Sequence, residues 1–356
     1  MNLSEDKSNE FYRGIRSNSL WVMPFSLIIS VVLLGLIELA FMSGLIWRLP
    51  VELLLPDIRN DWIFQAHRLN NLKNHGGEGH KLYILGGSSC REAFISEMSI
   101  QEALSRAGNP GHRVLNMCTS SQTMADTFLI IEALGQGPGN ILVGLNPLKF
   151  SYGRDVLKET IQGHRFIMKS ENLKRYLGSL GVKSKSLNDF YFWRAGPYLG
   201  ELLLKPVRIL GDMINRGQFT LGHQFLHHAH RTPPTPADIE ENKKELRSKH
   251  FKNFMANKDL NLNIFSLVIE KAMASGFKVI LFELPMNPIV RDHYLDVLNI
   301  YQPMIRRFAS KYQLPYLEYM WGLPLDRSDF FDFSHLLDRG RSIYQDAFVS
   351  YLNDLL

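Results

Sequence analysis

Short apolar segments alternate with helical patterns along most of this chain of 356 residues. The first apolar segment, 82–85, has no polar alternation, which is typical of a strand buried on both faces of a parallel sheet. Further strand candidates lie at 113–117, 140–145, 277–282 and 314–319, and helical patterns at 97–107, 123–134, 261–274 and 290–311. This alternation predicts a doubly wound parallel sheet of about five strands, in a flavodoxin-like order.

One segment near the start, 21–47, does not fit that alternation. It is apolar over more than the ~20 residues that cross a bilayer, and Trp21 and Trp47 stand at its two ends, as in interfacial belts. A cleaved signal peptide is the alternative, but no clear small-residue cleavage site follows the apolar run. We therefore predict a polar tail at 1–20, one transmembrane anchor at 21–47 and a connector at 48–79.

The charges beside the anchor give a slight positive-inside bias. Lys7, Arg13 and Arg16 precede it, whereas Arg48 and Arg59 follow it. The bias favours a tail inside and a large domain outside, which would be a single-pass protein with a periplasmic or extracellular domain. A cytoplasm-facing lipid esterase remains the alternative because the bias is small.

Glu38 lies inside the apolar run, where an ionisable side chain is costly. Such a residue suggests contact with a membrane partner, and Gly35, Ser43 and Gly44 offer small surfaces for packing against another helix. The alternative is that Glu38 reaches the interface or is protonated.

The composition is that of an ordinary folded protein, with 45% hydrophobic and 21% charged residues. The formal net charge of +5 comes without a long basic run or a nucleic-acid motif, so no nucleic-acid partner is expected. The only two cysteines, Cys90 and Cys118, each follow a predicted strand by a few residues. They could pair in an oxidising compartment or remain two free thiols.

The stretch from about 151 to 258 breaks the alternation and predicts a helical insertion into a domain at 80–356. An insertion at a strand's carboxyl end could form a substrate lid. If 222–230 is helical, His223, His227 and His230 share a face, which is a metal-like arrangement. No carboxylate or cysteine completes a motif there, so we expect a polar face, no metal and no other cofactor.

Polar residues that suit acyl transfer follow the predicted strands. Ser88 comes after the first strand and a glycine pair, as a nucleophile would, although a helix N-cap is the alternative. His335 could take the proton of Ser88, and Asp332, three residues earlier, could orient the imidazole. Asn146 and backbone amides could stabilise an oxyanion.

Together these segments resemble the SGNH, or GDSL-like, hydrolase superfamily. Residues 86–88 resemble its first block with the serine nucleophile, 144–146 its third block with the oxyanion asparagine, and 332–335 its fifth block with aspartate and histidine. The resemblance covers residue 81 to the end, apart from the insertion. It implies a flavodoxin-like α/β/α sandwich with Ser88, Asp332 and His335 as the catalytic residues.

Two positions depart from the family pattern. The second block normally provides a glycine amide to the oxyanion, and here Ser121, or alternatively Ser120, stands at that place. Pro147 replaces the last residue of the Gly-x-Asn-Asp pattern. The resemblance then implies oxyanion donors at Ser88, Ser121 and Asn146, and Ser89 is the alternative nucleophile.

A second polar stretch ends the strand at 277–282. Asn287 and Arg291 would point near the same sheet edge as Glu283, and with Gly87 they are candidates for substrate binding. The alternative is a tight turn shaped by the neighbouring prolines.

A membrane-anchored domain of this type resembles bacterial proteins that add or remove acyl groups on cell-surface or exported polysaccharides, and the anchored D-alanyl transfer protein of teichoic acid systems is related in architecture. The resemblance implies an inner-membrane esterase or O-acyltransferase with an acyl-Ser88 intermediate, no cofactor, and a membrane acyltransferase or secretion complex as candidate partner. The alternative function is a catalytically weak or inactive scaffold in a polysaccharide assembly complex.

Overall fold

The computed structural model describes residues 5–48, 61–74, 79–161, 167–182, 190–196, 198–200, 232–318 and 322–356, with 5–23 as backbone only. Its strands are β1 (His80–Leu85), β2 (His112–Asn116), β3 (Gly139–Leu145), β4 (Lys278–Glu283) and β5 (Tyr316–Leu317). They form one parallel sheet in the order β2-β1-β3-β4-β5. This is the flavodoxin-like order, so the predicted fold class is confirmed.

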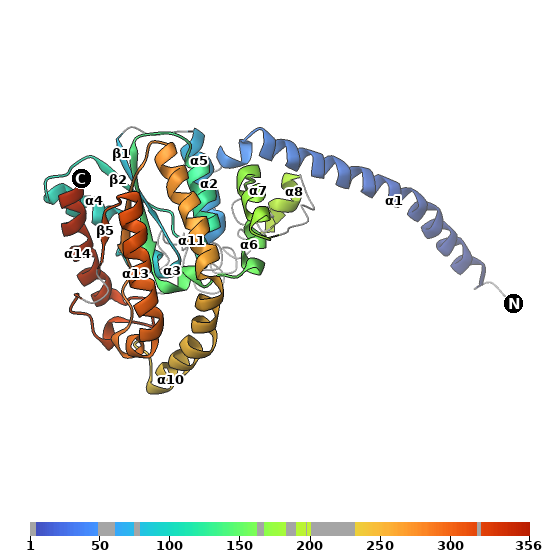
Figure 1. Ribbon diagram of the computed structural model, residues 1–356. Helices are drawn as coiled ribbons and strands as arrows, with labels where there is room; N and C mark the ends of the chain where they lie inside the picture. The colour runs from blue at the N-terminus through green and yellow to red at the C-terminus, as the bar shows by residue number, and fades with distance from the viewer. Residues whose placement is uncertain are drawn as a thin grey trace.

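Helices cover both faces of the sheet (Figure 1). On one face, β1 residues Tyr83 and Leu85 pack with α5 (Met124–Leu134), α11 (Phe251–Ala274) and α13 (Leu295–Tyr312). On the other face, Leu82 and Ile84 pack with α4 (Glu97–Arg106) and α14 (Asp338–Leu355). Because both faces are covered, the central strands are apolar without alternation, as the sequence indicated.

Helix α2 (Asp61–Asn74) lies in the segment predicted as a connector, yet it packs as part of the domain. Ala66 and Leu69 are fully buried in the same core cluster as α5. The apolar side chains of α2 therefore belong to the α/β core, which extends N-terminal to the predicted start at residue 80.

The described parts of the insertion are mainly helical, and η4 (Pro147–Phe150) leads into them from β3. The helices are α6 (Arg154–Ile161), α7 (Glu171–Ser179), α8 (Tyr191–Arg194) and α10 (Pro236–Glu245), and the π-helix η5 (Leu246–His250) joins α10 to α11. Leu157, Leu173 and Leu177 pack in the same core as α5, so α6 and α7 lie against the sheet domain. The histidine group at 223–230 lies outside the described residues.

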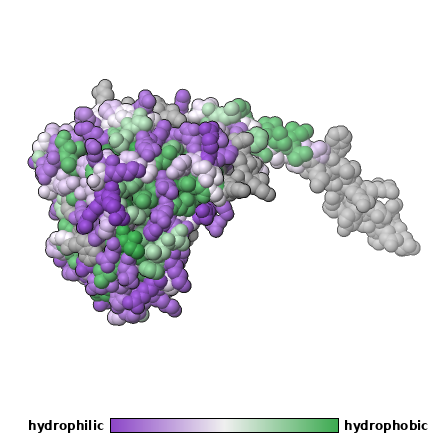
Figure 2. Space-filling model, in the orientation of Figure 1, coloured by the Kyte–Doolittle hydropathy of each residue, from purple (hydrophilic) through white to green (hydrophobic). Residues whose placement is uncertain are grey.

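Helix α1 (Glu5–Met42) projects from the domain (Figure 1), and its described side chains form a hydrophobic surface (Figure 2). The part from Pro24 to Met42 has a mean hydropathy of 2.5 and is long and apolar enough to cross a membrane. The helix begins at Glu5, so most of the predicted tail has helical backbone.

Candidate active site

The turn after β1 places Ser88 at the carboxyl edge of the sheet. A side chain at Gly86 would lie 2.4 Å from Cys90 Cβ, so only glycine fits there. Gly87 then has open space around its missing Cβ, and Ser88 starts the short helix α3 (Ser88–Arg91). As the first residue of that helix, Ser88 has no partner within it for its backbone N–H. The neighbours β1 and β3 flank the point where the strand order reverses, which is where open α/β sheets bind ligands.

Ser88, His335 and Asp332 form one hydrogen-bonded chain. His335 Nε2 lies 2.9 Å from Ser88 Oγ, and His335 Nδ1 lies 2.7 Å from Asp332 Oδ2. An ionised carboxylate only accepts hydrogen bonds, so Nδ1 carries the proton and Nε2 of a neutral ring presents its lone pair to Ser88. This arrangement suits removal of the serine proton.

Asp332 is held in its ionised form. Burial alone raises the pKa of its carboxyl, but His335 and the backbone amides of Ser334 and His335 outweigh burial, so the pKa lies below its ordinary value. Those amides donate to Asp332 Oδ1 at 2.8 and 2.9 Å. The carboxylate therefore fixes both the loop and the imidazole.

Asn287 supports this loop from β4. Its side-chain Nδ2 donates to the Asp332 carbonyl at 3.1 Å, and its backbone N–H donates to the Phe333 carbonyl at 3.0 Å. The side chain is fully buried. The structure thus places Asn287 against the backbone of Asp332 and Phe333, as a residue that positions the triad loop.

The loop after β2 distinguishes between Ser120 and Ser121. The backbone N–H of Ser120 donates to Asp61 Oδ2 at 2.6 Å, so this amide is already engaged. Ser121 is exposed and has φ +51°, a left-handed conformation that favours glycine. Ser121 therefore adopts a backbone conformation that favours glycine, the residue type that the resemblance implies at this position.

Asp61 and Arg91 connect this loop to α3, the short helix that begins at Ser88. Arg91 Nη1 binds Asp61 Oδ2 and lies 3.3 Å from Ser120 Oγ, while its Nη2 binds Glu92 at 2.9 Å. Asp61 and Arg91 are both almost fully buried. Sequence reasoning missed this network, because its members are distant in sequence and belong to no recognised motif.

Asn146 follows β3 and is also buried. Its Nδ2 donates to Ser89 Oγ at 3.0 Å, and its Oδ1 accepts from the backbone of Lys149 at 3.2 Å. Pro147 is the first residue of η4, a position where a missing N–H costs nothing, so this departure leaves Asn146 in place. Ser89 is hydrogen-bonded to Asn146, whereas Ser88 is hydrogen-bonded to His335, so the geometry favours Ser88 over Ser89 as the candidate nucleophile.

The two cysteine side chains pack beside Gly86, in the turn that precedes Ser88. Cys90 Sγ and Cys118 Sγ lie 3.0 Å apart, both fully buried, as free thiols. Burial and the neighbouring Cys90 raise the pKa of the Cys118 thiol, while burial lowers the pKa of the Lys149 amine beside it. Cys118 is therefore a neutral packing group and a poor nucleophile.

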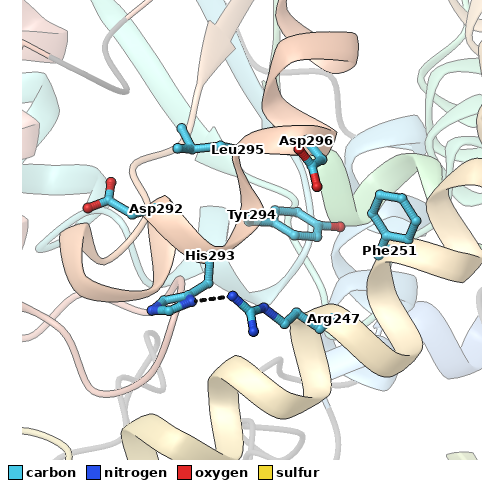
Figure 3. Close-up of a pocket in the computed structure, with 7 residues that line it drawn as sticks. All are labelled: Arg247, Phe251, Asp292, His293, Tyr294, Leu295 and Asp296. Carbon is cyan, nitrogen blue, oxygen red and sulfur yellow. Dashed lines mark hydrogen bonds between the residues drawn. The ribbon is translucent and has the colours of Figure 1, made fainter.

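The candidate Arg291 follows Asn287 by one helical turn, and its backbone N–H donates to the Asn287 carbonyl at 3.0 Å. It ends α12 (Pro288–Arg291), and its guanidinium lies 3.7 Å from Asp292. The next residues line a surface pocket of about 430 Å³ together with Arg247 and Phe251, and none of the triad residues lines it (Figure 3). In the pocket, Arg247 Nη2 lies 2.9 Å from His293 Nδ1.

No protein-family model matches the sequence, and the search of curated proteins finds no match either. Within the part of the chain that the structure describes, no group of three or more His, Cys, Asp or Glu residues could hold a metal ion. The chemistry of the site therefore has to be inferred from its own geometry.

Proposed function

We propose that the chain is a membrane-anchored SGNH-like acyl esterase or O-acyltransferase that acts on an exported or cell-surface polysaccharide. The observation that carries this proposal is the hydrogen-bonded chain from Ser88 through His335 to Asp332. The parallel sheet and the position of Ser88 at its reversal point support it further. The anchor supports an envelope location, with the domain on the periplasmic or extracellular side of the inner membrane.

In the first half-reaction, Ser88 Oγ attacks the carbonyl carbon of an ester or thioester while His335 Nε2 takes the serine proton. The carbonyl oxygen becomes an oxyanion, for which the candidate donors are the amides of Ser88 and Ser121 and the side chain of Asn146. The intermediate collapses as the bond to the leaving group breaks, and His335 gives that group the proton. The product is acyl-Ser88.

In the second half-reaction, His335 takes a proton from the acceptor hydroxyl, which attacks the acyl carbon. Ser88 Oγ leaves and recovers the proton from His335. Water as acceptor gives hydrolysis, and a sugar hydroxyl gives acyl transfer. Exclusion of water and positioning of the sugar decide between these outcomes.

The alternative is a scaffold of the same fold with a weak or inactive site. Asn146 favours this alternative, because its Nδ2 donates to Ser89 Oγ and its Oδ1 accepts the backbone N–H of Lys149 in η4. In such a protein, the site residues would only stabilise the sheet edge.

The test uses the full chain in detergent with p-nitrophenyl acetate, in the presence and absence of an oligosaccharide acceptor. We expect release of nitrophenol and a Ser88 peptide heavier by one acetyl group in rapidly quenched samples. Ser89→Ala is the matched control because it removes the adjacent hydroxyl. Release that is equal in wild type and Ser88→Ala would contradict the enzyme proposal and favour the scaffold. Acetylated oligosaccharide, detected by mass spectrometry, would identify a transferase.

A further inference from the structure

Two aromatic side chains of the insertion are left exposed beside the anchor. Phe190 is 63% exposed and Trp193 is 57% exposed, at the start and within the single turn of α8. In the described part of the chain, no other exposed phenylalanine or tryptophan lies outside α1. Large exposed aromatics that are close together indicate an interaction surface.

Glu38 fastens α8 to the anchor. Its two carboxylate oxygens accept the backbone N–H groups of Tyr191 and Phe192, each at 2.9 Å. Glu38 therefore has partners within its own chain, at the exposed N–H groups of a helix start. No second membrane protein is needed to explain a carboxylate within the apolar segment.

A small aromatic cluster strengthens the same junction. Phe41 of α1 stacks on Tyr191, with ring centres 5.9 Å apart, and lies 5.8 Å from the ring of Tyr198. Trp47 packs on Tyr198 at 5.5 Å, and Phe41, Trp47 and Tyr198 are all buried. The end of the anchor and the insertion thus form one packed unit.

The position of this junction along α1 fixes its depth. Glu38 precedes Met42, the last residue of α1, by about one helical turn, or roughly 6 Å at 1.5 Å per residue. If 24–42 crosses the bilayer, Met42 lies at the edge of the hydrocarbon core, and the contact of Glu38 with α8 lies roughly 6 Å inside that edge. Tryptophan is enriched in the interfacial layer next to that edge.

We propose that Phe190 and Trp193 insert into the interfacial layer of the bilayer beside the anchor, so that α1 and α8 form a two-point membrane contact. The partner is a lipid surface, because Glu38 and Phe41 join α8 to a helix whose apolar side chains are exposed. A single flexible tether would let the domain rotate, whereas two points fix the orientation of the sheet edge relative to the membrane. The inference rests on the proposed anchor but does not depend on the activity of Ser88.

The test places a fluorescent thiol label at three positions of the full chain in liposomes. They are Trp193, Leu33 in the anchor, which is 53% exposed, and Met98 on α4, which is 65% exposed, each changed to cysteine. The native thiols are fully buried, and unmodified wild type controls for their labelling. Lipids brominated at a shallow acyl position and aqueous iodide serve as the two quenchers.

For Trp193→Cys, we expect lipid quenching several-fold above that of Met98→Cys, and weaker iodide quenching. Adding Glu38→Ala should lower the lipid quenching at position 193 toward the level of Met98→Cys. Equal behaviour of positions 193 and 98 would overturn the inference while leaving the anchor intact. A lack of quenching in Leu33→Cys would overturn the anchor and this surface together. Fluorophosphonate labelling of Ser88 in the same liposomes reports separately on the proposed enzyme.

Discussion

The two sides of Ser88 differ in how their polar groups are used. On the side of the proposed base, Asp332 accepts from His335 Nδ1, and His335 Nε2 faces the serine hydroxyl. On the oxyanion side, the amide of Ser120 binds Asp61, Asn146 binds Ser89, and Ser121 adopts a conformation that favours glycine. The hydrogen bonds around His335 are therefore arranged as proton transfer requires, whereas the polar groups on the proposed oxyanion side hold the loops.

In the proposed enzyme, activation of Ser88 and stabilisation of the oxyanion therefore depend on separate groups at one sheet edge. Under that proposal, Ser88 would form the acyl-enzyme with the help of His335, and turnover would depend on the weaker oxyanion side.

Substitutions of His335 and Asp332 should cause the largest losses of turnover. His335→Ala removes the proton acceptor, and Asp332→Asn removes the carboxylate that fixes the ring, so each should lower turnover by roughly three to four orders of magnitude. Turnover and acyl-enzyme formation, measured with an activated ester, check this expectation. Retention of most activity in Asp332→Asn would show that the hydrogen-bonded chain does not drive the reaction.

Asn146→Ala should have a smaller effect, about two to three orders of magnitude, if its amide stabilises the oxyanion. Ser89→Ala is the control, because it removes the present partner of that amide but not the amide itself. We expect Ser89→Ala to retain activity within roughly tenfold of wild type. Equal losses in the two variants would mean that Asn146 acts through its contact with Ser89.

Ser121→Gly should relieve backbone strain and raise the free energy of unfolding by about 1 kcal/mol. Gln313, with φ +53° at the end of α13, is a matched control because it precedes β5, at the sheet edge opposite to the one that carries Ser88. Gln313→Gly should stabilise by a similar amount without changing activity. If Ser121→Gly changes neither stability nor turnover in thermal and kinetic assays, the glycine-like role of Ser121 is contradicted.

The lowered pKa of Asp332 predicts a small dependence of stability on acidity. Because the folded-state pKa is below that of the unfolded chain, this carboxylate stabilises the fold above about pH 4, and the contribution is lost as pH falls through the folded-state pKa. Thermal unfolding of wild type and Asp332→Asn should therefore differ more near pH 5 than near pH 3. A difference that grows toward low pH would reverse the assigned direction.

The sheet was predictable because its signal is local. Apolar runs such as 82–85 reveal buried strands, and the observed order confirms the flavodoxin-like arrangement. The last strand, expected over 314–319, is limited to Tyr316–Leu317. Helix α11 starts at Phe251, well before the expected helix at 261, because α10 and η5 run directly into it.

The candidate site was predictable where short motifs mark its residues, such as the glycine pair before Ser88 and the three-residue spacing of Asp332 and His335. The structure brings Ser88, His335 and Asp332 together, as the order of segments suggested. The contacts of Asp61 with Ser120 and of Glu38 with α8 join segments that are distant in sequence. No local pattern marks such pairs, so only the folded chain reveals them.

The most direct test of Ser88 as an activated nucleophile is labelling of the folded full chain in detergent with a fluorophosphonate probe. The arrangement predicts labelling of wild type and Ser89→Ala, and loss of labelling in Ser88→Ala and His335→Ala. Circular dichroism establishes that each variant is folded. Folded wild type that fails to react, or labelling that persists in Ser88→Ala, would contradict the assignment of Ser88.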